Sequence, residues 1–154
     1  CWGDKVGGGD CSIVQQAQLN ITTVVGNSKA YAALTSTGSV VCWGKALYGG
    51  EIPSDLAPSL SANVVSLHAT DRAFAAVKSN GQVIVWGQTG HGGPVAAIGG
   101  LLLSNVHTVC SNSVAFMAIK TDGTAVGWGH PITIPNSGVQ FVSPFVAPSM
   151  VRCI

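Results

Sequence analysis

The sequence predicts an all-β protein of the propeller type, built from blades of antiparallel strands. A Trp-Gly pair recurs about every 42 residues, at Trp2, Trp43, Trp86 and Trp128. Repeat periods of roughly 40 to 45 residues are typical of propeller blades. Each of the last three pairs also lies at the end of the same sequence motif. In this motif, two apolar runs flank a turn dipeptide that ends in Gly. We therefore expect three full repeats and a split or degenerate fourth.

The middle repeat shows the pattern most clearly. We expect strands at 73–77 and 83–87, joined at Asn80-Gly81. A third apolar run at 64–68 precedes them, as 21–25 and 106–110 precede the other two hairpins. The turn glycines are Gly38, Gly81 and Gly123. Gly and Asn tolerate positive φ, so the sequence predicts two-residue turns with positive φ at both central positions.

Two further features repeat with the hairpins. Ala32, Ala75 and Ala118 leave one face without bulk, which predicts a crowded strand near the propeller axis. Four Trp residues at one register could be a row of ligand-stacking platforms. Packing of each blade on the next is the favoured interpretation, because one repeat cannot bury its apolar face alone and a large aromatic ring contributes much burial energy.

A Gly pair begins six residues after each of the first three Trp residues, at Gly8-Gly9, Gly49-Gly50 and Gly92-Gly93, and the fourth repeat lacks it. The loops carry no Lys-Ser/Thr ending and no helix signal, so they are not predicted to cradle phosphate. Asp10 and Glu51 follow two of the pairs at equivalent places. A carboxylate there can accept hydrogen bonds from turn amides, which predicts a structural role.

This repeated text resembles the regulator-of-chromosome-condensation repeat family. The resemblance rests on Ala-Phe-Ala-Ala-Val at 73–77, the Asn-Gly turn, Val-Ile-Val-Trp-Gly at 83–87 and the trailing Gly pair, and it extends to Trp128-Gly129. It implies a β-propeller, commonly of seven blades, that serves as a protein–protein interaction module. The short loops lack the Gly-Gln-Leu-Gly run of the founding member. The wedge with which that member exchanges nucleotide on a small GTPase has no counterpart here.

The 154 residues are expected to form a single repeat domain, 1–154. Its repeats are 1–3 (the end of a split blade), 4–44, 45–87, 88–129 and a degenerate 130–154. Two arrangements are open. The chain either closes as a small four-bladed ring whose ends share a blade, or forms an arc of a longer propeller. An atypical last unit is common in capping repeats, which favours the small ring.

Charged residues make up 8% of the chain, against about 25% in ordinary soluble domains. So few charges protect a free surface poorly from self-association, which favours a surface covered by other proteins. The seven Lys and Arg residues are spread along the sequence, so we expect no basic patch and no nucleic-acid partner. The longest apolar stretch, 95–103, is too short to span a membrane as a helix.

Nothing in the sequence predicts catalysis, a metal site or a cofactor. The five Cys residues show no C-x-x-C spacing, and no two of the four His residues share a repeat position. A ring closure would bring Cys1 near Cys153, where a disulfide is one possible outcome.

The predicted function is therefore non-enzymatic: a protein–protein interaction scaffold or accessory subunit of a larger assembly. An organellar or membrane-associated complex fits the low charge of the chain. One alternative is a glycan- or small-ligand-binding propeller that uses Tyr48, His91 and exposed Trp side chains. A second, by family analogy, is a small-GTPase regulator. The expected interface comprises the loops after each Trp-Gly and the Pro-rich segment 130–148. Its candidate residues are Tyr48, His91, His130, Pro131, Phe141 and Phe145.

Overall fold

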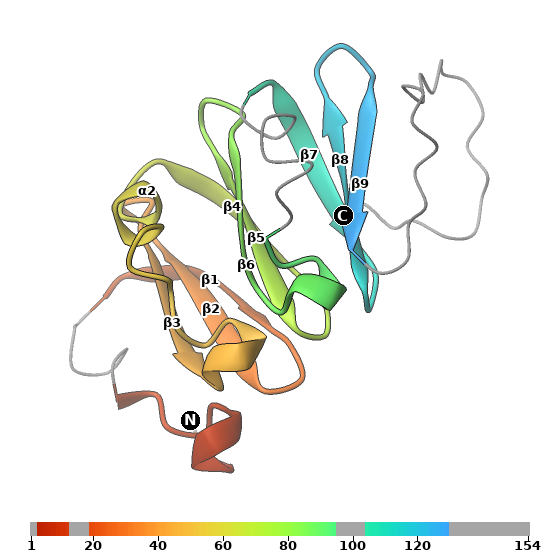
Figure 1. Cartoon of the computed structure of the whole chain (residues 1–154). Helices are drawn as coiled ribbons and strands as arrows, with labels where there is room; N and C mark the ends of the chain where they lie inside the picture. The colour runs from red at the N-terminus through yellow and green to blue at the C-terminus, as the bar shows by residue number, and fades with distance from the viewer. Residues whose placement is uncertain (1–2, 13–18, 95–103, 130–154) are drawn as a thin grey trace.

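The computed structural model describes residues 3–12, 19–94 and 104–129. They form three antiparallel sheets of three strands each (Figure 1). The sheets are blade 1, with β1 (Ile21–Gly26), β2 (Ala30–Thr35) and β3 (Val40–Gly44); blade 2, with β4 (Val64–Ala69), β5 (Ala73–Lys78) and β6 (Val83–Gly87); and blade 3, with β7 (Val106–Ser111), β8 (Ala115–Lys120) and β9 (Ala125–Gly129). The short helical pieces are η1 (Lys5–Gly7), η2 (Ala46–Tyr48), α2 (Ala57–Leu60) and η3 (Thr89–His91). The predicted all-β fold of propeller-type blades is confirmed.

The three blades repeat the same strand register. In each, the middle strand pairs with both neighbours, and its aromatic residue lies opposite the Trp of the third strand. These cross-strand pairs are Tyr31 with Trp43, Phe74 with Trp86, and Phe116 with Trp128. Their rings stack with centroids 5.5, 5.6 and 5.3 Å apart. Such cross-strand aromatic pairs stabilise a sheet and help to fix its register.

The hairpin turns differ from the prediction. In blade 2 the amide of Gly81 donates to the carbonyl of Lys78 (2.9 Å), and the amide of Lys78 donates to the carbonyl of Gln82 (2.8 Å). This pattern defines a three-residue loop in which the glycine alone has positive φ (+77°). The side chain of Asn80 accepts a hydrogen bond from the amide of Gln82 (3.0 Å), which stabilises the turn without positive φ at the asparagine. Blades 1 and 3 repeat the two backbone bonds.

The prediction for the alanines also needs correction. Ala118 pairs with Val126 in the register that Ala33 and Ala76 occupy in the other blades, whereas Ala32 and Ala75 lie one residue earlier. All five lie on the middle strand of a blade, and none has exposed surface. The first strand and the middle strand of a blade both contact the first strand of the next blade. The small residues on the middle strands therefore allow neighbouring sheets to pack closely.

Neighbouring blades are joined by backbone hydrogen bonds at both ends. At the hairpin end, the amide of Val64 donates to the carbonyl of Gly38 (2.9 Å), and the amide of Val106 donates to that of Gly81 (3.0 Å). At the opposite end, the amide of Ser28 donates to the carbonyl of Asp71 (3.2 Å), whose own amide donates to the next blade. The links fix the spacing of the blades.

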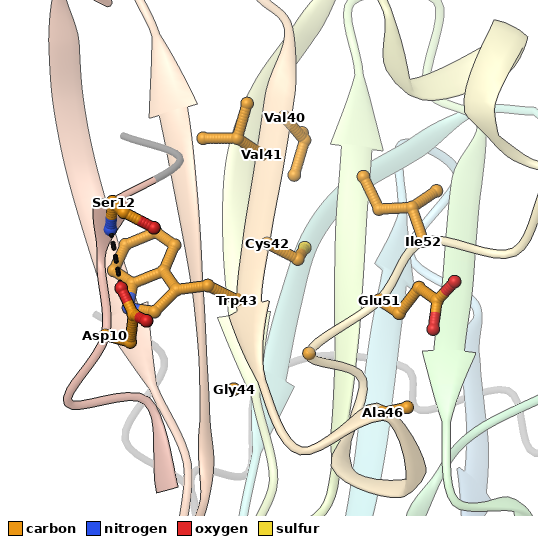
Figure 2. Close-up of a pocket in the computed structure, with 11 residues that line it drawn as sticks. Asp10, Ser12, Val40, Val41, Cys42, Trp43, Gly44, Ala46, Glu51 and Ile52 are labelled. Atoms are coloured by element: carbon orange, nitrogen blue, oxygen red, sulfur yellow. Dashed lines mark hydrogen bonds between the residues drawn. The ribbon is translucent and has the colours of Figure 1, made fainter. Parts of the chain in front are cut away.

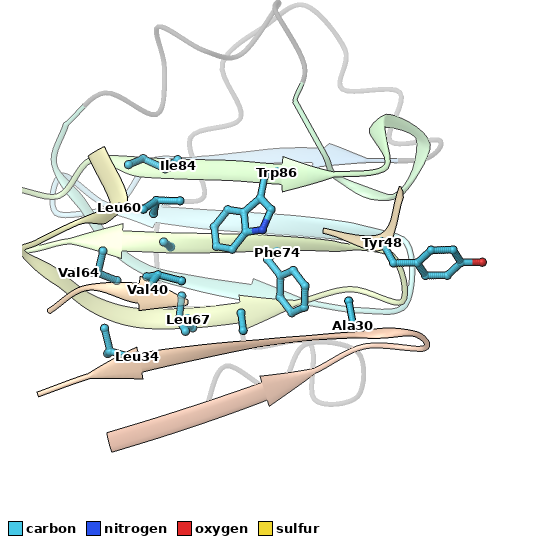
Figure 3. Close-up of a cluster of buried hydrophobic side chains, with 12 residues drawn as sticks. Ala30, Leu34, Val40, Tyr48, Leu60, Val64, Leu67, Phe74, Ile84 and Trp86 are labelled. Carbon is cyan, nitrogen blue, oxygen red and sulfur yellow. The ribbon is translucent and has the colours of Figure 1, made fainter. Parts of the chain in front are cut away.

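The apolar core lies between the blades. The cluster between blades 1 and 2 contains Leu34, Leu67, Phe74 and Trp86, and Leu60 of α2 lies toward the end of the cluster opposite Tyr48 (Figure 3). An equivalent cluster lies between blades 2 and 3. Since each blade contributes one side of a shared core, the blades are stable only together.

Candidate functional site

The three η turns gather at one end of the blades, opposite α2 (Figure 1), and we call this surface the loop end. It is held in place by the Trp residues. The indole N–H of each Trp donates to the carbonyl of the first glycine in the preceding Gly pair. The distances are 3.2 Å from Trp43 to Gly8, 3.0 Å from Trp86 to Gly49 and 3.0 Å from Trp128 to Gly92. We call each such unit a Trp–Gly lock.

The Gly pair is required by close packing. A Cβ at Gly49, where φ is +85°, would lie 2.7 Å from the ring of Phe74. A Cβ at Gly50 would lie 2.4 Å from the backbone of Gly44. Both positions therefore exclude side chains, and the loop folds back on the Trp-Gly of its own repeat. The indoles of Trp43, Trp86 and Trp128 have at most 7% exposed surface, so they are not free to stack on a ligand.

Tyr48 and His91 are the two predicted interface residues within the described chain. Each is the last residue of its η turn, so they occupy equivalent positions in successive blades. The Asn27 side-chain amide donates to the carbonyl of Tyr48 (2.7 Å), and the Thr70 hydroxyl donates to that of His91 (2.6 Å). The imidazole Nδ1 of His91 is buried without a hydrogen-bond partner. The loop end thus holds both backbones rigidly while their side chains differ.

Three cationic side chains surround Tyr48. The ammonium groups of Lys29 and Lys45 lie 6.0 and 5.4 Å from its ring centroid, and the guanidinium of Arg72 lies 5.3 Å away. Such distances permit cation–π attraction. We call Lys29, Lys45 and Arg72 the basic cluster. The expectation that basic residues form no patch is wrong here, because residues distant in sequence meet where two blades adjoin.

A groove of about 610 Å³ runs along β3 (Figure 2). Its lining includes Asp10 and Ser12 from the segment after η1, Cys42 and Trp43 from β3, and a segment after η2 that contains Glu51 and Ile52. The Ser12 amide donates to Asp10 (3.1 Å), and this bond holds the pKa of the Asp10 carboxyl below its ordinary value. No such bond reaches Glu51 in the described chain, so the predicted structural role applies to Asp10 alone.

The floor of this groove is an open strand edge. Hydrogen-bonded pairs alternate along an antiparallel ladder. The amide of Lys45 donates to Lys29 (2.8 Å), and the amide of Thr35 donates to Ser39 (2.9 Å). The hydrogen-bonded residues of β3 are therefore Val41 and Trp43. The backbone groups of the alternate residues, Val40, Cys42 and Gly44, face away from β2. Within the described residues no hydrogen bond reaches these outward-facing groups.

The cysteines have different states. Cys11 and Cys110 are each disulfide-bonded, whereas Cys42 is a free thiol. Burial raises the pKa of the Cys42 thiol to about 12, so it is protonated and unreactive at neutral pH. The suggested Cys1–Cys153 disulfide lies outside the described residues.

Several sequence predictions cannot be placed. Trp2, and the interface candidates His130, Pro131, Phe141 and Phe145, lie outside the described residues. Within the described chain no group of three or more His, Cys, Asp or Glu side chains could hold a metal ion. The described helices include none that is long and apolar enough to cross a membrane.

These features define a repeat protein of the β-propeller class, whose blades are joined by Trp–Gly locks. No family model matches the sequence, and no curated protein matches it. Solved structures do share the fold. The ectodomain of the CRINKLY receptor kinase ACR4 of Arabidopsis thaliana aligns with a TM-score of 0.54 and 14% identity over 99% of this chain and 46% of its own. The ectodomain of the receptor kinase CR4 of Physcomitrella patens aligns with a TM-score of 0.53 and 20% identity, over 91% of this chain and 35% of its own.

Yeast RCC1 (Prp20), solved with Kap60 bound, aligns with a TM-score of 0.50 and 16% identity over 73% of this chain and 30% of its own. The fold is thus the RCC1-like repeat propeller that the sequence indicated. The chain spans between 30% and 46% of the length of these three structures. The described blades correspond to part of such a propeller.

Proposed function

We propose that the chain is a non-enzymatic protein-interaction module, which serves as a docking platform or accessory subunit in a larger protein assembly. The observation that carries the proposal is the groove along β3. On its floor, the outward-facing backbone groups of Val40, Cys42 and Gly44 form no hydrogen bond with any described residue, and apolar side chains lie beside them. An exposed strand edge of this kind accepts an extended segment of a partner by strand addition.

Two further findings support this proposal. Yeast RCC1, a protein of the same fold, was solved with Kap60 bound, so the fold is used for protein binding. The low content of charged residues, 8%, suits a surface that is covered by other proteins. The loop end, with Tyr48 and His91, and segment 130–148 would provide additional contacts in the assembly.

The disulfide-bonded Cys11 and Cys110 bear on where the assembly forms. Disulfides persist in oxidising compartments and are rare in the cytosol. We therefore place the module in an oxidising compartment. This location is compatible with a membrane-associated assembly whose interacting domains face outward.

Native mass spectrometry of the protein purified from its source tests the proposal, followed by amide hydrogen exchange of the complex. In the isolated chain we expect the outward amides of Val40, Cys42 and Gly44 to exchange faster than those of Val41 and Trp43, which bond to β2. A bound partner should protect the first group selectively. A chain that always purifies alone, or a complex in which the β3 amides keep their free exchange rates, would contradict the proposal.

A further inference from the structure

The basic cluster brings three like charges together around one aromatic ring. Three of the seven basic residues of the sequence lie within 6.0 Å of the ring centroid of Tyr48. Tyr48 itself belongs to the core between blades 1 and 2, and it projects from one end of that core (Figure 3). Its ring therefore provides a fixed point around which the three cations are arranged.

The backbones of these cations are held by the strand ends. Lys29 precedes β2 and Lys45 follows β3, and the Lys45 amide donates to the Lys29 carbonyl (2.8 Å). Arg72 has the same place in blade 2 as Lys29 in blade 1, and its carbonyl accepts from the amide of Gln88 (2.9 Å). A guanidinium nitrogen of Arg72 also donates to the side-chain oxygen of Gln88 (3.2 Å). A site built on strand ends is pre-organised, which lowers the entropic cost of binding.

Among the described residues, no carboxylate balances the positive charge of the basic cluster. All six carboxylates of the sequence lie in the described chain, and none forms a salt bridge with a described Lys or Arg. Like charges gathered in one place repel each other, and a bound anion removes this repulsion. An electrostatically unbalanced cluster on a rigid surface is therefore suited to an anionic partner.

We propose that Lys29, Lys45 and Arg72, arranged around Tyr48, form a docking site for an acidic segment of a partner protein. This inference rests on the proposed function and specifies the chemistry of the partner. The planar guanidinium of Arg72 suits a carboxylate, which it can bind through two parallel hydrogen bonds, and the two ammonium groups suit a second acidic side chain nearby.

The geometry favours a peptide over a nucleic acid or a sulfated polysaccharide. Those polyanions require a row of cations that follows their regularly spaced charges. Here the cations surround a single ring. Of the other described basic residues, the ammonium of Lys78 donates to the carbonyl of Ser59 (2.7 Å), Lys5 lies in η1 at the loop end but outside the group around Tyr48, and Lys120 ends β8. One or two acidic side chains of an extended segment match this compact footprint.

The test uses the full chain and a fluorescein-labelled peptide that carries six consecutive Glu residues, with a Gln peptide of the same length as reference. Anisotropy titrations at low ionic strength compare wild type with the double variant K29Q/K45Q. The matched control K5Q/K120Q has the same net charge. We expect the K29Q/K45Q variant to bind the acidic peptide about tenfold more weakly, and the control to stay within about twofold of wild type. Arg72→Lys keeps the charge but loses the planar fork, and should weaken binding about threefold.

Three results would overturn this inference: equal affinity for both peptides, equal loss in the two double variants, or displacement of the acidic peptide by heparin or single-stranded DNA at lower concentrations than by free acidic peptide. The last would assign the cluster to another polyanion. Failure here leaves the β3 exchange experiment unaffected, because the amides of Val40, Cys42 and Gly44 report on a different surface.

Discussion

The Trp–Gly lock predicts that equivalent Trp residues contribute unequally to stability. Trp86 and its stacking partner Phe74 are both fully buried, and the indole N–H donates to the carbonyl of Gly49 at 3.0 Å. Trp43 makes the equivalent bond, at 3.2 Å, but its partner Tyr31 is 37% exposed. The same substitution therefore removes the same hydrogen bond in two different environments.

Trp86→Phe leaves the carbonyl of Gly49 buried without a donor, which costs about 1–3 kcal/mol. The smaller ring also loses burial and leaves a gap, at roughly 0.8 kcal/mol for each methylene equivalent. We expect the free energy of unfolding to fall by about 3 kcal/mol. In Trp43→Phe, water can reach the vacated space beside Tyr31, so we expect a loss of about 1–2 kcal/mol.

Urea unfolding followed by circular dichroism measures both values, and the midpoint and slope of the transition give the free energy. A loss below about 0.5 kcal/mol in Trp86→Phe, or equal losses in the two variants, would refute the argument that burial of the lock determines its contribution.

Three further predictions concern single positions. Gly49→Ala should lower the free energy of unfolding by about 2–4 kcal/mol, because φ is +85° and the new Cβ would lie 2.7 Å from the Phe74 ring. Gly90→Ala is the control: its Cβ would meet nothing within 4 Å, so the loss in the same urea assay should stay under about 1 kcal/mol. Burial lowers the pKa of His68 in the folded chain, so as the pH falls the unfolded chain takes up a proton at a higher pH than the folded chain does. Unfolding free energy should therefore be steady above pH of about 6.5 and fall as the pH drops below it, and this fall should be absent in His68→Gln. Cys42, with its pKa raised to about 12, should resist iodoacetamide in the native chain at pH 7.5 and react once urea unfolds it, and labelling at equal rates in both states would contradict its burial.

The strands could be predicted from the sequence because their signals are local and repeated. The expected strand at 73–77 appears as β5 (Ala73–Lys78), and 83–87 appears as β6 with the same bounds. The turn type was missed, since Gly81 needs positive φ in either kind of loop. What separates the two is how Asn80 uses its side chain, and the dipeptide does not reveal this.

The basic cluster was missed because its residues are scattered along the chain and meet only through strand register. One signal was nevertheless present. Lys29 and Arg72 both directly precede the Ala that begins a middle strand, and Lys45 directly follows a Trp-Gly. Superposing the repeats by register would have placed these residues at one end of adjoining blades. The groove along β3 had no such signal, because the open edge depends on which segments fail to pair.

The Trp–Gly lock explains why one repeat can carry different surface chemistry in each blade. The lock fixes Gly8, Gly49 and Gly92 by packing and hydrogen bonding, so these positions cannot vary without strain. The residue immediately before each glycine is Gly7, Tyr48 or His91, and hydrogen bonds to the backbone carbonyl hold it at Tyr48 and His91. Because the backbone is already fixed, a change of side chain at this position can alter what the loop end binds without moving the loop, although removal of the Tyr48 ring would also remove part of the core between blades 1 and 2. The variable position beside an invariant glycine is therefore where binding specificity in this fold can change most readily.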